Sequence, residues 1–193
     1  MTTGSQCKEI EMAHSKSLYS FRMAQKAEMT ALCALINSVY RGEAAKGGWT
    51  TEAELLGGQR CDVAMLEKLS DKPDSGFLVA TKEGEIIACC HVQLATAAVA
   101  ECGMLSVTPA WQNQGIAKAL LRTAEQYSRE TWQATRMRLW IIKQRPELAE
   151  YYQRRGYRLT GATLPFPDDV RYGIPRVNGL YLLALEKVIA SAG

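Results

Sequence analysis

The chain has 193 residues, of which 47% are hydrophobic and 22% charged, and its formal net charge is +3. A chain of this length can bury a sizeable core without disulfide or metal crosslinks. The small net charge is too low to indicate nucleic acid as a partner on its own. No apolar run reaches membrane-spanning length, and the first residues lack the pattern of a secretory signal. We therefore expect a cytoplasmic protein with a single domain over residues 17–190.

The cysteines and histidines argue against a metal site. The chain has six cysteines and two histidines, with no Cys-x-x-Cys pair. Cys89 and His91 would share a strand face, but no second pair of ligands follows them. We expect no bound metal and interpret the cysteines as core thiols of a reducing compartment.

The N-terminal region predicts a strand followed by a helix. Residues 1–16 are polar and without pattern, which is typical of a disordered tail. Residues 18–23 alternate as a strand does. Apolar residues then recur at helical spacing from Met29 to Tyr40, and Gly42 is expected to end this helix.

A turn-rich insertion is expected at residues 40–51. After it, Thr51-x-x-Glu54 resembles a capping box, which predicts a short helix through Leu56. Residues 61–69 predict another short helix.

The remainder of the chain predicts a sheet and two further helices. Runs of apolar and β-branched residues bounded by turn residues indicate the strands. The expected strands are 77–81, 85–94, 101–107, 136–142, 157–159 and 180–185. One helix starts near Ile116, and another starts with Pro146 and is stopped by Gly156. Residues 161–179 are predicted to be a long loop, a feature that often serves function.

The joint between strand 101–107 and the following helix is a candidate anion cradle. It reads Gln112-Asn113-Gln114-Gly115-Ile116-Ala117. A helix start has unpaired N–H groups and the positive end of the helix dipole, so it can hold a phosphate. Gly115 lets a ligand approach the main chain, and Ala117 is nearly as small. Taken alone, a simple tight turn explains these residues equally well, and no dinucleotide-binding fingerprint is present.

Two motifs together resemble the GNAT superfamily of N-acetyltransferases. Gln112-x-x-Gly115-x-Ala117 is similar to the family signature (Arg/Gln)-x-x-Gly-x-(Gly/Ala). The segment 151–157, Tyr-Tyr-Gln-Arg-Arg-Gly-Tyr, is similar to the second motif of the family. The resemblance covers roughly residues 76–160, and two motifs in order are more specific than either alone. It implies an α/β (α+β) fold with a mixed, largely antiparallel, twisted sheet flanked by helices.

The resemblance implies acetyl-CoA as cosubstrate, with its pyrophosphate at the cradle. The residues expected to contact it are Leu105, Ser106, Val107, Gln112, Asn113, Gln114, Gly115, Ile116, Ala117 and Lys118. Main-chain N–H groups of 105–107 would polarise the thioester carbonyl. In the family, a splay between this strand and the next admits the pantetheine arm. Gln114 departs from the pattern, because many members carry Lys or Arg there.

Two side chains are candidates for moving protons. An alkyl ammonium titrates at about 10, so the acceptor amine needs a base. Glu101 resembles, by its spacing, the glutamate base of some family members, and alternation would place it on the same face as Leu105. An ordinary solvated carboxylate is the equally weighted alternative. Tyr152 matches the motif position of the general acid that protonates the coenzyme A thiolate, and a core aromatic is its alternative.

The candidate acceptor residues lie in the two insertions. They are Trp49, Phe166, Asp168 and Tyr172, with the aromatic residues shaping a wall and Asp168 meeting a cationic acceptor. The expected function is transfer of an acetyl group from acetyl-CoA to the primary amine of a small molecule or peptide N-terminus. The amine would attack directly in a ternary complex.

Two alternatives stay open. A non-catalytic acyl-CoA sensor or interaction module would keep the cradle and lack turnover. A role on tRNA would rest on a cluster of arginines that an ordinary solvated surface explains better. We expect a small-molecule amine as partner, no nucleic acid and no membrane, and the resemblance leaves a homodimer open.

Overall fold

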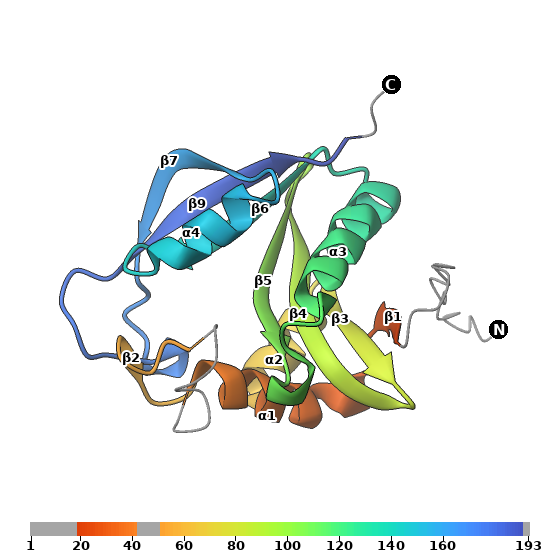
Figure 1. Ribbon diagram of the computed structural model, residues 1–193, viewed down its shortest axis with the longest axis horizontal. Coiled ribbons are helices and arrows are strands. Elements are labelled where there is room, and N and C mark those ends of the chain that lie inside the picture. The colour runs from red at the N-terminus through yellow and green to blue at the C-terminus, as the bar shows by residue number, and fades with distance from the viewer. Residues whose placement is uncertain (1–18, 42–50, 191–193) are drawn as a thin grey trace.

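A computed structural model describes residues 19–41 and 51–190. The predicted tail at residues 1–16 and the candidate acceptor residue Trp49 lie outside the described residues. Figure 1 shows a twisted sheet with helices on both of its faces. Within the two described segments, no helix is long and apolar enough to cross a membrane.

The described strands form a seven-stranded sheet in the order β1-β3-β4-β5-β6-β9-β7. Their bounds are β1 Ser20–Met23, β3 Ser75–Lys82, β4 Glu85–Thr96, β5 Val99–Val107, β6 Arg136–Ile142, β7 Arg158–Pro165 and β9 Tyr181–Val188. Neighbouring strands are antiparallel except for β5 and β6, which are parallel. This mixed, mostly antiparallel sheet flanked by helices confirms the expected fold class.

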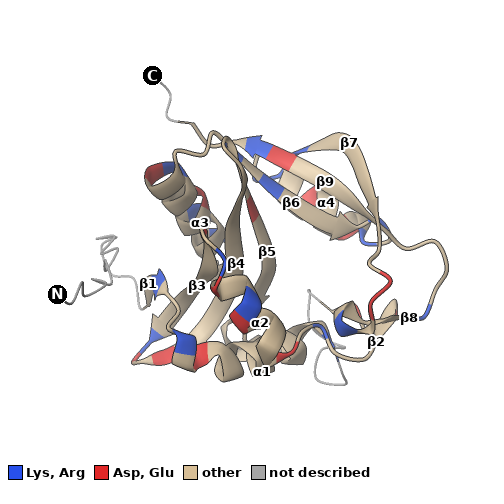
Figure 2. Ribbon diagram, turned by 180° about the vertical axis from the view of Figure 1, so that it is seen from behind, with Lys and Arg blue, Asp and Glu red and all other residues tan. Residues whose placement is uncertain are grey.

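Helices cover the two faces of the sheet separately. The helices are α1 Met29–Tyr40, α2 Val63–Ser70, α3 Ile116–Trp132 and α4 Pro146–Gln153, with short 3-10 turns η1 Lys26–Glu28, η3 Pro109–Trp111 and η4 Val170–Tyr172. α1 and α2 pack on one face, and α3 packs on the other (Figure 2). One buried core includes Ile36 of α1 with Phe77 of β3, and the other includes Leu120 of α3 with Leu78 of β3. Successive side chains of β3 point to opposite faces of the sheet, so this strand contributes residues to both cores.

Strand β5 contains a bulge at its centre. Two of its residues, Met104 and Leu105, oppose the single residue Cys90 of β4. Met104 has a φ of 52°, in the left-handed region. The extra residue interrupts the alternation, so Met104 packs in the core beside α1 while Leu105 packs in the core beside α3. The expectation that Leu105 shares a face with Glu101 is therefore wrong.

Strands β5 and β6 separate soon after they meet. Their parallel ladder runs only from the pair Val99–Arg136 to the pair Glu101–Arg138. Beyond it the two strands diverge, as Figure 1 and Figure 2 show from opposite sides. The expected splay is present. From Cys102 onward, the β5 main-chain groups that face β6 have no ladder partner there, and such groups need other partners.

Two local predictions are wrong because long-range pairing decides the structure. Thr51 does not start a helix; the chain turns, and the two-residue strand β2, Leu56–Gly57, pairs with β8, Ile174–Pro175. The predicted loop 161–179 is largely ordered structure. β7 continues through Pro165 along β9, and η4 and β8 occupy part of the remainder.

Candidate functional site

Two cavities adjoin the splay and share Leu105 as a lining residue. The first, called here the cradle cavity, has a volume of about 360 Å³. It is lined by Leu105, Val107, Trp111, Gln112, Asn113, Gly115, Ile116, Ala117, Lys118, Tyr151 and Arg155. The second, called here the splay cavity, has a volume of about 420 Å³ and lies against β4, β5 and β6. The bulge places Leu105 between the two.

The start of α3 forms the floor of the cradle cavity. Gly115 caps the helix with a φ of 80° and a ψ of 0°, a left-handed conformation that glycine adopts without strain. Gln112 ties the turn to β5, since its Nε2 donates to the carbonyl of Val107 at 3.1 Å. The first α3 hydrogen bond returns from the N–H of Ala119 to the carbonyl of Gly115. The N–H groups before Ala119 in the helix therefore remain for an anion.

All the residues predicted to contact the donor line this cavity except Ser106 and Gln114. The Ser106 side chain is fully buried, and its hydroxyl donates to the carbonyl of Met104 at 3.0 Å. Gln114 is exposed, and its Nε2 donates to the carbonyl of Ala110 at 3.1 Å. Gln114 therefore does not line the cavity.

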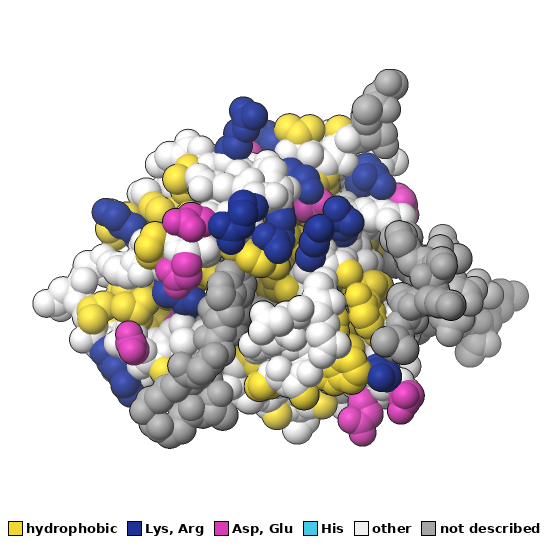
Figure 3. Space-filling model, viewed as in Figure 1, with side chains coloured by type: hydrophobic (Ala, Val, Ile, Leu, Met, Phe, Trp, Pro, Cys, Tyr) yellow, Lys and Arg dark blue, Asp and Glu magenta, His cyan; other side chains and the backbone are white. Residues whose placement is uncertain are grey.

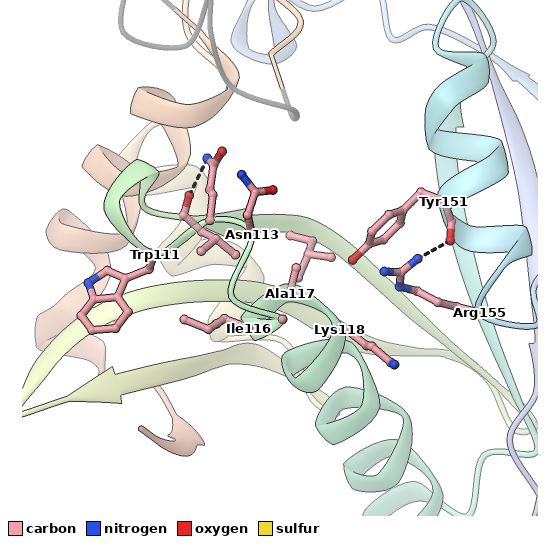
Figure 4. A pocket seen from close by; sticks show the side chains of 11 residues that line it. Trp111, Asn113, Ile116, Ala117, Lys118, Tyr151 and Arg155 are labelled. Carbon is pink, nitrogen blue, oxygen red and sulfur yellow. Dashed lines mark hydrogen bonds between the residues drawn. The ribbon is translucent and has the colours of Figure 1, made fainter. Parts of the chain in front are cut away.

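Sequence reasoning missed the cavity wall contributed by α4. Figure 4 shows Tyr151 of α4 and Arg155 of the turn after it reaching toward the start of α3, where Lys118 extends toward them. The Arg155 guanidinium lies over the Tyr151 ring at 3.2 Å from its centroid, and Nη1 donates to the Tyr151 carbonyl at 2.6 Å. In the described part of the chain, nothing pairs with the buried Arg155 Nε. The four-residue spacing of this pair, in the motif at 151–157, could have indicated it.

Positive charge accumulates at the cradle cavity. Figure 3 shows Lys and Arg side chains gathered along the gap where α3 faces α4, above a hydrophobic floor. Lys118 and Arg155 are the cations that line the cavity itself. Two cations and a helix N-terminus at a mostly apolar hollow suit a ligand with an anionic part and an extended apolar part.

The splay cavity contains most of the other candidate residues. Glu101, Tyr152, Phe166 and Tyr172 line it, together with residues that include Tyr40, Glu52, Arg60, His91, Gln93 and Trp140. Asp168 is exposed and does not line it. The structure thus brings the two proton-transfer candidates to one cavity and leaves Asp168 outside it.

Glu101 is held by three donors. Gln93 Nε2 donates to its Oε2 at 2.9 Å, and Trp140 Nε1 donates to its Oε1 at 3.0 Å. Arg138 Nη1 lies 3.5 Å from the same Oε1. The carboxylate is 19% exposed, so it is an oriented group at the cavity wall rather than a freely solvated one. Each carboxylate oxygen can accept two hydrogen bonds, which leaves Oε2 able to accept another.

Tyr152 is both a core residue and a cavity residue. It is 8% exposed and packs edge-to-face against Tyr151 and Tyr157, with ring centroids 5.2 Å and 5.8 Å away. Burial, with a smaller contribution from nearby Tyr40, raises the pKa of Tyr152 well above its ordinary value. Its phenol is therefore protonated at neutral pH, and burial also makes it a weaker acid than a free tyrosine.

His91 is a titratable residue of the splay cavity that sequence reasoning did not assign to the site. Its Nε2 lies 2.9 Å from the hydroxyl of Ser75, whose own proton is donated to the carbonyl of Leu69 at 2.7 Å. The imidazole is therefore the donor in this pair. Burial, followed by the charges of Lys72 and Arg60, lowers the pKa of His91 to about 4. The ring is neutral at pH 7.

Sequence and structure comparisons point to one family. The acetyltransferase (GNAT) family model matches residues 44–157. A comparison with curated proteins finds no significant match.

Several solved structures are similar. Ard1 from Thermoplasma volcanium has a TM-score of 0.66 at 15% identity, covering 91% of this chain and 100% of that one. The yncA structure from Salmonella typhimurium, which contains its cofactor acetyl-CoA, has a TM-score of 0.65 at 16% identity, covering 92% and 97%. The ribosomal-protein-S18-alanine N-acetyltransferase from Escherichia coli has a TM-score of 0.64 at 13% identity, covering 91% and 96%. At these identities the likeness shows the fold.

Proposed function

The chain belongs to the acetyltransferase (GNAT) family, and on that premise we propose that it transfers an acetyl group from acetyl-CoA to a primary amine of a small molecule or a peptide N-terminus. One observation carries the proposal. A cationic cradle at a helix start shares Leu105 with a second cavity, and that cavity contains an oriented carboxylate and a protonated buried tyrosine.

The donor is held from both sides of the cradle cavity. The unpaired N–H groups at the start of α3 bind the pyrophosphate, with Lys118 and Arg155 as its counterions. The pantetheine arm follows the gap between β5 and β6, where main-chain groups of β5 are available to it. The thioester then lies near Leu105, where the two cavities adjoin.

The acceptor amine approaches from the splay cavity. Its nitrogen attacks the thioester carbonyl carbon, and the carbon–sulfur bond breaks as the tetrahedral intermediate collapses. Main-chain N–H groups near 105–107 stabilise the oxyanion. Glu101 takes the amine proton, directly or through a water, and Tyr152 gives its proton to the leaving thiolate. The products are the acetylated amine and coenzyme A.

The test separates donor binding from turnover. We expect calorimetry to show acetyl-CoA binding to the parent protein and to both Glu101→Gln and Tyr152→Phe. With a reactive amine, each variant should lose on the order of 100-fold or more in kcat, the usual contribution of a positioned acid or base. Tyr127→Phe, on the half-buried side of α3 away from both cavities, serves as the control and should keep the parental rate.

Three outcomes would change the proposal. Parental rates in both Glu101→Gln and Tyr152→Phe would show that the two roles are wrongly assigned. Binding of acetyl-CoA without turnover of any amine would favour the non-catalytic acyl-CoA module. Absence of acetyl-CoA binding would remove the acetyltransferase function altogether.

A further inference from the structure

The splay cavity contains a cation that nothing in the described chain neutralises. Arg60 lines the cavity, and its Nη1 is buried without a hydrogen-bond partner among residues 19–41 and 51–190. Its guanidinium makes neither an ion pair nor a hydrogen bond to any described side chain; its contact is with the ring of Tyr40, 5.6 Å from the centroid. A desolvated guanidinium N–H without an acceptor is costly and uncommon in a folded protein.

The main chain at Arg60 is fixed in place. Asn37 of α1 accepts hydrogen bonds from the N–H of Arg60 at 2.6 Å and of Cys61 at 3.3 Å through its Oδ1. Its Nδ2 donates to the carbonyl of Cys61 at 2.8 Å. Tyr40 lies about one helical turn after Asn37, and the Arg60 guanidinium lies over its ring. The main chain at Arg60 is therefore anchored to α1, and its guanidinium lies against the Tyr40 ring.

The other charges of this cavity are already matched. Glu52 forms a buried ion pair with Arg41 at 2.5 Å. Glu101 has Arg138 at 3.5 Å as well as its two neutral donors. His91 is neutral, because its pKa is about 4. Among the described lining residues, the unmatched charge is the positive charge of Arg60.

We propose that the acceptor is a small amino acid-like molecule, and that Arg60 binds its carboxylate while its amine faces Glu101 and the thioester. The inference rests on the proposed function and specifies its substrate class. A guanidinium presents paired N–H donors that match a carboxylate, and a bound carboxylate would neutralise the charge of Arg60 at the cavity wall. The cavity volume of about 420 Å³ accommodates a molecule of this size. This assignment replaces the expectation that Asp168 selects a cationic acceptor, since Asp168 lies outside the cavity.

The experiment compares acids with their own amides. The parent protein and Arg60→Gln are assayed for coenzyme A release with acetyl-CoA and the twenty proteinogenic amino acids. Each reactive acid is then paired with its C-terminal amide and with a polyamine as a cationic reference. The amide has the same side chain and lacks the negative charge. The quantity of interest is the acid-to-amide ratio of kcat/KM, compared between the two proteins, because this comparison cancels the difference in amine pKa.

Arg60→Gln is expected to lower kcat/KM for the acid by about ten-fold to 100-fold, the usual effect of losing a hydrogen bond to a charged group. The amide should change by less than about three-fold. Arg60→Lys should recover part of the loss, because it restores the charge without the planar fork. Arg158→Gln, on the exposed strand β7, is the matched control and should resemble the parent. Equal acetyl-CoA affinity and melting temperature in all four proteins shows that each is folded.

Other outcomes overturn the inference in distinguishable ways. Equal losses for acid and amide in Arg60→Gln would show that Arg60 has a structural role. Turnover of amides or polyamines without turnover of any acid would show that the acceptor carries no carboxylate, while the proposed acetyl transfer stands. Turnover of no acid and no amine overturns the inference too, and the calorimetric binding of acetyl-CoA then decides whether the proposed function fails with it.

Discussion

Replacing Gly115 by alanine tests whether the left-handed turn before α3 binds an anion. Gly115 has a φ of 80°, and a Cβ added there would meet no heavy atom within 4 Å. Alanine would therefore not clash in the free protein, and its cost comes from the backbone conformation alone. That cost is about 1–2 kcal/mol for a residue with a Cβ in the left-handed region.

Gly84 offers a matched control. It lies in the two-residue turn between β3 and β4, with a φ of 87° and likewise no heavy atom within 4 Å of an added Cβ. Urea denaturation should show a loss of about 1–2 kcal/mol in the free energy of unfolding for both alanine variants. Calorimetry should show that only Gly115→Ala weakens acetyl-CoA binding, by about ten-fold or more, because its Cβ stands where a phosphate approaches the main chain.

The comparison can refute the reasoning in two ways. If Gly115→Ala binds acetyl-CoA with parental affinity, the pyrophosphate does not contact this turn. If Gly84→Ala weakens binding as much as Gly115→Ala does, the loss follows from lower stability rather than from the site.

Two further predictions concern charge. Arg155→Ala should raise KM for acetyl-CoA by about ten-fold and leave kcat nearly unchanged, whereas Arg154→Ala, 65% exposed in the same turn after α4, should change neither. Equal effects of the two variants in initial-rate assays would contradict the assignment. Because the pKa of His91 is about 4 when folded and about 6.5 when unfolded, the unfolded chain takes up this proton first as the pH falls. Between pH 7 and pH 4 the parent should therefore lose roughly 3 kcal/mol more of its free energy of unfolding than His91→Gln loses. Urea denaturation at several pH values measures this, and an equal dependence on pH in the two proteins would contradict the prediction.

The parts of the fold that local sequence determines were predictable. Glu83 and Gly84 have φ values of 51° and 87°, the conformation of a tight hairpin turn, and the expected hairpin is confirmed. The bulge in β5 was not predictable, because methionine has no preference for the left-handed region that Met104 adopts. The register of β4 against both ends of β5 imposes it. The strand at Leu56 likewise forms only because a distant segment pairs with it.

The same distinction applies to the site. The cradle residues and Tyr152 belong to contiguous motifs, so sequence reasoning could name them as candidates. Arg60 and His91 have no motif around them. Arg60 reaches the splay cavity because Asn37 of α1 binds its main chain, and His91 does so because β4 lies beside β5. Such residues become visible only when tertiary contacts are known.

The short ladder between β5 and β6 also has a consequence for the mechanics of the molecule. It divides the sheet into two halves, and three residue pairs join them directly. A donor in the cradle cavity would contact α3 on one half and Tyr151 and Arg155 on the other. A bound donor would therefore add contacts between two halves of the sheet that share few of their own. Its binding should therefore slow amide exchange in both halves together and, at a hundred times its Kd, add about 2.7 kcal/mol to the stability of the whole protein.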